Sequence, residues 1–125
     1  MTSYAIGRVL EYRTKAIFEK HGFVVDRRGA SKPADLVVKR NGVVLFACEC
    51  KRTSKKDKDT LYVEKEDVDR CIEFAKRDMA KPLLVVSFYR SPVYVFDARE
   101  MKTERKMIRV DRGQGEEIEE FLKHF

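Results

Sequence analysis

An Asn-Gly pair at positions 41 and 42 separates two apolar runs, and it constrains the fold of this chain more than any other feature. Both residue types tolerate the positive φ angles of a two-residue β-turn, so Asn-Gly between apolar segments is a strong hairpin signal. The pattern predicts antiparallel strands at residues 36–40 and 43–48. Side chains two positions apart in a strand share a face. One face of the second strand is therefore predicted to carry Val44, Phe46, Cys48 and Cys50, and the other Leu45, Ala47, Glu49 and Lys51.

The open end of this hairpin carries charged side chains. Asp35 precedes the first strand, and Glu49 and Lys51 follow the second, so the turn brings Asp35 beside Glu49. Two carboxylates from neighbouring strands suit Mg²⁺, which takes oxygen ligands and keeps several waters. A lysine beside them could hold or deprotonate an attacking water and stabilise charge on a phosphate. The pattern thus predicts phosphodiester hydrolysis at Asp35, Glu49 and Lys51, with an ion pair at a strand end as the alternative.

The remaining periodicity predicts a mixed α/β domain with a central mixed β-sheet flanked by helices, spanning residues 1–125 as one domain. Helices are expected at residues 2–21, 65–80 and 116–125, and further strands at 23–25, 83–88, 93–97 and 108–110. The polar stretch from 52 to 60 is expected to be a loop. In the first helix the best apolar stripe contains Ile6, Val9 and Leu10. Glu11 lies nearly opposite that stripe, so the pattern alone predicts a solvated residue.

Net charge indicates the class of partner. Lys and Arg total 27 against 21 Asp and Glu, giving +6, which favours a polyanion. The three cysteines argue against a disulfide scaffold, and with two unpaired histidines they do not favour zinc. Cys48 and Cys50 are then small apolar residues of one strand face. Because neither a membrane span nor a secretory signal is evident, we expect a cytoplasmic, DNA-associated protein without membrane partners.

Basic residues cluster on both sides of the charged hairpin end, and they predict a DNA surface rather than a merely solvated charge run. The predicted contacts are Arg27, Arg28, Lys32, Lys51, Arg52, Lys55, Lys56 and Lys58. Tyr62 either contacts nucleic acid or caps the core, and the sequence favours neither.

Several segments, in order, resemble the archaeal Holliday junction resolvases of the PD-(D/E)xK nuclease superfamily. They are residues 7–11, 20–25, 31–37, 49–51, 61–63 and 72–75, and the similarity covers roughly residues 7–88. The resemblance implies a restriction-endonuclease-like fold and a homodimeric, Mg²⁺-dependent endonuclease, with Mn²⁺ as an alternative ion. Such an enzyme makes paired symmetric cuts in four-way DNA junctions, in recombination and repair.

The same resemblance assigns roles by position. Glu11 matches an acidic residue of the family's first helix with a catalytic and metal-binding role, and Asp35, Glu49 and Lys51 match its other metal-binding and catalytic residues. The main-chain carbonyl of Cys50 would be a further metal ligand. Arg27 matches a functional arginine and Ser31 a serine of the loop that follows, both placed at the DNA.

Two other functions remain open from the sequence. One is another nuclease of the same superfamily, of repair or restriction type. The other is a non-catalytic basic DNA-binding module whose acidic residues are structural. The dimer surface is also open between the face of the 65–80 helix and a C-terminal stripe of Ile118, Phe121, Leu122 and Phe125.

Overall fold

The computed structural model describes residues 3–28, 33–53 and 59–125. Its helices and strands follow the order predicted from the sequence and add two strands, β4 and β8. They are α1 (Ser3–Lys20), β1 (Val24–Arg27), β2 (Leu36–Arg40), β3 (Val43–Arg52), β4 (Thr60–Glu64), α2 (Lys65–Lys76), β5 (Lys81–Ser87), β6 (Val93–Asp97), β7 (Met107–Asp111), β8 (Glu116–Glu117) and α3 (Ile118–Leu122). Within these ranges no helix is both long and apolar enough to cross a membrane.

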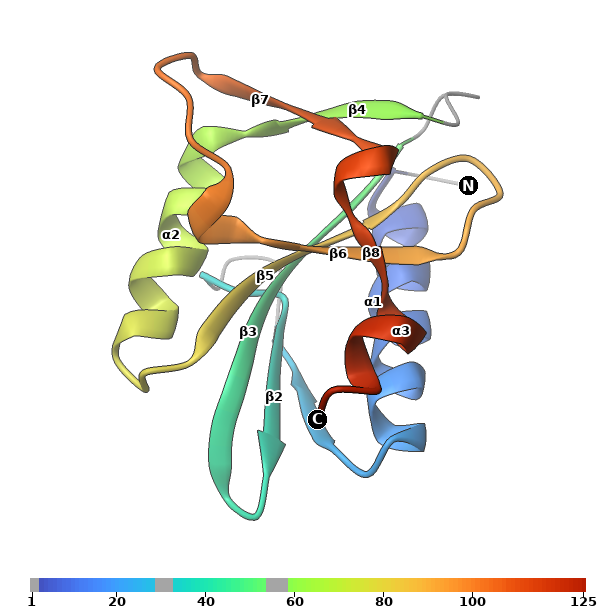
Figure 1. The fold of residues 1–125 in the computed structure, drawn as a ribbon, viewed down its shortest axis with the longest axis vertical. Coiled ribbons are helices and arrows are strands. Elements are labelled where there is room, and N and C mark those ends of the chain that lie inside the picture. The colour runs from blue at the N-terminus through green and yellow to red at the C-terminus, as the bar shows by residue number, and fades with distance from the viewer. Residues whose placement is uncertain (1–2, 29–32, 54–58) are drawn as a thin grey trace.

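The strands form two sheets in the described part of the chain. A six-stranded sheet has the order β1-β2-β3-β5-β6-β8, and β4 pairs with β7 in a separate two-stranded sheet. β3 and β5 are parallel, whereas the other pairings are antiparallel. Helix α2 connects β4 to β5 and lies on one side of the large sheet, while α1 and α3 lie on the other (Figure 1). The mixed sheet between helices confirms the predicted fold class.

The hairpin of β2 and β3 forms as its Asn-Gly turn predicts. Asn41 and Gly42 have φ angles of 53° and 78°, both in the left-handed region that this turn requires. Leu36 pairs with Cys48, so Asp35, the preceding residue, comes next to Glu49. The register shifts by one residue after Val38, leaving Leu45 as an extra residue in β3. The shift lies near the turn, so the alternation of β3 toward its carboxyl end is undisturbed.

Two apolar layers hold the large sheet between the helices. On the side of α1 and α3 the core contains Phe18, Phe46, Cys48, Ile118 and Leu122, all buried. On the side of α2, Ala47 packs with Cys71 and Ala75. Beyond the register shift the two faces of β3 therefore separate as predicted, with Cys48 facing α1 and Ala47 facing α2. Leu45, predicted on the face of Ala47, instead packs against the core of Phe46, because the shift at Val38 makes it an extra residue. The cysteines are free thiols packed as small apolar side chains.

The first helix presents a different face to the sheet from the one its apolar stripe predicts. Leu10, Thr14 and Phe18 are buried, whereas Val9 is 46% exposed. Positions 10, 14 and 18 follow a four-residue spacing, which places them on one side of a helix. Because Glu11 adjoins this buried face, the prediction of a solvated Glu11 is wrong, and its side chain is only 16% exposed.

Three further boundaries differ from the predictions. Helix α2 ends at Lys76 rather than residue 80, and Met79 has a φ of 55° and is 95% exposed. The last helix is confined to Ile118–Leu122 because the preceding pair, Glu116–Glu117, joins β6 as β8. Thr60, expected in a loop, begins β4, whose buried Leu61 and Val63 pack with Ile108 and Val110 of β7.

Candidate active site

The candidate site lies where β2 and β3 meet, between α1 and α2. Asp35 is fixed by three hydrogen bonds: its main-chain N–H donates to the Cys48 carbonyl (2.9 Å), and its carbonyl accepts from Arg28 (2.8 Å). Its carboxylate oxygen Oδ2 accepts the N–H of Cys50 at 2.7 Å. This last bond ties Asp35 across the hairpin to the residue between Glu49 and Lys51. The juxtaposition predicted from the turn is thus present.

Glu11 of α1 and Glu49 of β3 both interact electrostatically with Asp35. Burial raises the pKa of Glu11, and the nearby Asp35 carboxylate raises it further, while Arg27 lowers it. Burial is also the main cause that raises the pKa of Asp35, partly offset by the Cys50 N–H. Asp35 therefore acts on the carboxyl groups of both Glu11 and Glu49, and these three groups are referred to below as the acidic row.

Glu49 has the most perturbed carboxyl group of the row. Burial raises its pKa to about 8, the carboxylates of Asp35 and Asp67 add to the increase, and Arg70 and Lys51 oppose it. Asp67 and Arg70 belong to the first turns of α2 and form an ion pair with each other. They reach Glu49 because β3 turns the face that carries Ala47 and Glu49 toward α2. The sequence analysis missed both residues, although Asp67 lies one turn before the buried Cys71 and Arg70 directly precedes it.

The predicted metal site can be tested against this geometry. Among the described residues, no three His, Cys, Asp or Glu side chains are arranged so that they could hold a metal by themselves. Mg²⁺ keeps several waters and binds through only one or two protein carboxylates. The carboxyl groups of Asp35 and Glu49, whose pKa values are raised, and a main-chain carbonyl such as that of Cys50 provide such a set of oxygen ligands. The residues present therefore fit Mg²⁺, and they do not fit zinc.

The predicted DNA contacts divide into three groups. Lys51 and Arg52 are exposed at the end of β3, and Tyr62 is 54% exposed on β4, opposite Arg109 of β7. Arg27 and Arg28 are half-buried: Arg27 pairs with Glu11, and the Arg28 guanidinium lies 4.9 Å from the centre of the Phe74 ring. Ser31, Lys32, Lys55, Lys56 and Lys58 lie outside the described residues. Tyr62 is accessible for contact with nucleic acid.

The raised pKa of Glu49 predicts how stability varies with pH in metal-free protein. The folded state holds this proton up to about pH 8, whereas an unfolded glutamate releases it near 4.5. The stabilising contribution is therefore complete below pH 4.5 and is lost as pH rises toward 8. Between pH 5.5 and 8, wild type should lose at least about 1 kcal/mol relative to Glu49→Gln, or about 3–6 °C in Tm. Thermal unfolding in EDTA measures this difference, and parallel curves for the two proteins would contradict it.

Comparison with known proteins agrees with this fold and shows the family. The family described as "Archaeal holliday junction resolvase (hjc)" matches residues 2–125. A curated relative, the crossover junction endodeoxyribonuclease Hjc of Methanocaldococcus jannaschii, is 38% identical over 92 residues. That match covers 74% of this chain and 66% of the relative, slightly less than two thirds of the relative's length.

A solved structure shares the fold. The Holliday junction resolvase Hjc of Archaeoglobus fulgidus superimposes with a TM-score of 0.77 at 24% sequence identity, covering 95% of this chain and 97% of the other. The family match, which includes nearly every residue, extends the resemblance beyond Asp97, where the motifs alone give no alignment. The chain belongs to the archaeal Holliday junction resolvase family.

Proposed function

We propose that this protein is a structure-selective, Mg²⁺-dependent DNA endonuclease that resolves four-way junctions by paired symmetric hydrolysis of phosphodiester bonds. The observation that carries the proposal is the row of Glu11, Asp35 and Glu49 at one sheet edge in a member of this family. A protein that cuts recombination intermediates acts where the DNA is, so we also propose an intracellular location.

Each residue of the site has a proposed part in the reaction. Asp35 and Glu49, with the Cys50 carbonyl, would hold the cation, and Glu11 would be a further ligand. When bound, Mg²⁺ supplies Lewis-acid stabilisation of charge on the phosphate, and Mn²⁺ is an alternative. Lys51 follows Glu49 on the same strand face, where it would hold the attacking water and stabilise charge that develops in the transition state.

Binding would depend on phosphate contacts rather than on base sequence. Lys51, Arg52 and Tyr62 are exposed near the carboxylates or on the adjoining β4, and they support a surface that follows the DNA backbone. Contacts of this kind position a duplex without reading its bases. This suits an enzyme that recognises the shape of a junction.

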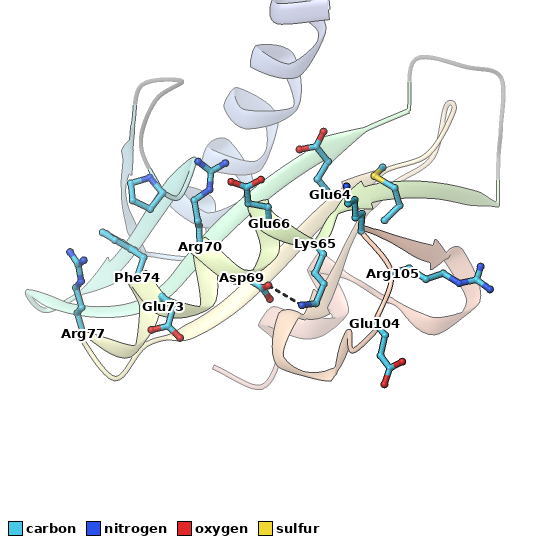
Figure 2. A pocket seen from close by; sticks show the side chains of 13 residues that line it. Glu64, Lys65, Glu66, Asp69, Arg70, Glu73, Phe74, Arg77, Glu104 and Arg105 are labelled. Atoms are coloured by element: carbon cyan, nitrogen blue, oxygen red, sulfur yellow. Dashed lines mark ion pairs between the residues drawn. The ribbon is translucent and has the colours of Figure 1, made fainter.

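The two-fold symmetry of a four-way junction favours a homodimer, because paired cuts need two equivalent active sites. The C-terminal stripe is poorly suited to form the interface because Ile118 and Leu122 are buried in the core. The outer face of α2 is better suited. It borders a groove of about 810 Å³ that includes Pro33 and Phe74 (Figure 2).

The charges along this groove also support a second copy as its occupant. Its acidic and basic residues are equal in number and interspersed: Glu64, Glu66, Asp69, Glu73 and Glu104 against Lys65, Arg70, Arg77, Arg105 and Lys106. In a two-fold dimer a surface meets itself, so mixed charges can pair across the axis. A groove with this composition is self-complementary, whereas a groove of one sign would repel its copy.

The proposed interface predicts the effect of a single substitution. Phe74→Glu should convert the dimer to a monomer at micromolar concentration, because it places a carboxylate in the apolar part of the groove. Sedimentation or light scattering measures the mass in solution. Phe125→Glu, at a residue that is 50% exposed in the competing C-terminal stripe, is the matched control and should remain dimeric. The reverse result would move the interface to the C-terminus.

Cleavage of synthetic DNA tests the function. A four-way junction and a linear duplex of equal length and sequence are compared in Mg²⁺ and in EDTA. We expect paired cuts in the junction, in Mg²⁺ only, with much weaker activity on the duplex. Equal cleavage of both substrates would indicate another nuclease of the superfamily. Binding without cleavage under every ionic condition would indicate a non-catalytic DNA-binding module.

A further inference from the structure

Arg27 forms an ion pair with Glu11, one member of the acidic row. Arg27, the last residue of β1, places its Nε 2.9 Å from Oε1 of Glu11 in α1. The Arg27 and Glu11 side chains are only 23% and 16% exposed, so this is a largely desolvated pair. On its other side the Arg27 guanidinium lies 4.9 Å from the centre of the Tyr12 ring, the residue after Glu11. Helix α1 thus holds Arg27 by a carboxylate and an aromatic face at consecutive positions.

Arg27 also acts on the next carboxylate of the row. Its charge opposes the effects that raise the pKa of Glu11, chiefly burial, and it does the same at Asp35. One guanidinium therefore offsets part of the negative charge of two proposed cation ligands. A divalent cation bound at the same carboxylates would take over that role.

The guanidinium of arginine suits two kinds of partner. Its planar set of N–H donors matches carboxylates and phosphates equally well, often through two parallel hydrogen bonds. In a half-buried site, losing one anionic partner is costly unless another replaces it. Exchange of a carboxylate for a phosphate avoids that cost.

We propose that Arg27 is a latch that couples cation binding to DNA binding: in the free protein it neutralises Glu11, and when a cation occupies the acidic row Arg27 is released to a DNA phosphate. This rests on the proposed nuclease function. Arg27 is in this scheme a positioning residue whose availability depends on the charge state of the row. Because coupling between two binding equilibria is reciprocal, DNA that binds Arg27 must also raise the affinity of the row for the cation.

A double-mutant cycle on junction binding in EDTA tests the latch without any contribution from a bridging metal. Glu11→Gln removes the carboxylate that holds Arg27, so it should raise junction affinity by at least about fivefold. In an Arg27→Gln background the same substitution only removes one negative charge, and its effect should fall below about twofold. Fluorescence anisotropy of a labelled four-way junction measures all four affinities, and circular dichroism checks that each variant is folded.

Two controls separate release of Arg27 from the general effect of charge. Arg28→Gln removes the adjacent arginine, which lies against Phe74 instead of the acidic row. In that background Glu11→Gln should keep its full effect. Asp35→Asn removes an equal negative charge from the row while Glu11 still pairs with Arg27, so in EDTA it should raise affinity less than Glu11→Gln. This second comparison needs no variant of Arg27.

The outcomes distinguish failure of the latch from failure of the function. If wild type binds the junction but Glu11→Gln acts equally in the wild-type and Arg27→Gln backgrounds, or no more strongly than Asp35→Asn, the ion pair is structural only and the latch is overturned. If wild type binds a four-way junction no more tightly than a linear duplex in any buffer, the proposed function itself fails.

Discussion

Asp35→Asn should lower the rate of junction cleavage by about 10³-fold or more. A bound cation contributes several kcal/mol of charge stabilisation in the transition state, and each 1.36 kcal/mol is a factor of ten. Asn keeps a side-chain oxygen that can accept the Cys50 N–H, a bond of 2.7 Å in the structure, so the hairpin end should keep its shape. Single-turnover cleavage in Mg²⁺ measures the effect. We expect a similar loss for Glu49→Gln and for both alanine variants.

A matched control shows whether the loss belongs to the site. Asp26→Asn removes a carboxylate of the same sheet that is 59% exposed and pairs with Lys39 at 3.0 Å. Its cleavage rate should stay within a few-fold of wild type. Junction binding by Asp35→Asn should also stay within a few-fold or improve, because the substitution removes negative charge near phosphates. Full cleavage by Asp35→Asn would mean that the cation is held elsewhere.

Lys51→Ala should lower the catalytic rate constant by about 10²-fold or more while changing junction affinity little. Removing one preorganised donor that acts on transition-state charge commonly has an effect of this size. Interactions made only in the transition state appear in the rate and not in binding. Single-turnover rates at saturating enzyme, together with equilibrium binding in EDTA, separate the two quantities.

Arg52→Ala provides the comparison for Lys51. Both residues are exposed at the end of β3, and as consecutive strand residues they point to opposite faces. Only Lys51 shares a face with Glu49, so Arg52→Ala should act on affinity rather than on rate. A loss confined to affinity in Lys51→Ala would make Lys51 one more phosphate contact.

Local sequence determined the part of the site that lies on the hairpin. The Asn41-Gly42 turn fixes which strands pair, and the two-residue period of β3 fixes which side chains share a face. Both are properties of a few adjacent residues, so Asp35, Glu49 and Lys51 could be placed together from the sequence. The same holds for α2, whose acidic first turn and basic Lys76 agree with the helix dipole.

The position of Glu11 could not be obtained in this way. Helix α1 has more than one side that could face the sheet, and its apolar pattern favoured the side with Val9, which is 46% exposed. The resemblance to the family indicated a role for Glu11, whereas the periodicity did not. Packing decided the face, since Phe18 joins Phe23 and Phe46 in an aromatic cluster of the core. That contact places Glu11 beside Arg27 and near Asp35.

By itself, then, the sequence determined the hairpin, the shared face of Glu49 and Lys51, and a basic chain suited to a polyanion. Only the tertiary structure decided which face of α1 is buried, that β4 pairs with a strand more than forty residues away, and that Asp67 and Arg70 reach Glu49. The physical reason is how far along the chain the interactions that decide each property reach. Turns and strand alternation depend on neighbouring residues, whereas a helix face, a distant strand partner and a carboxyl pKa depend on what the rest of the chain packs against them.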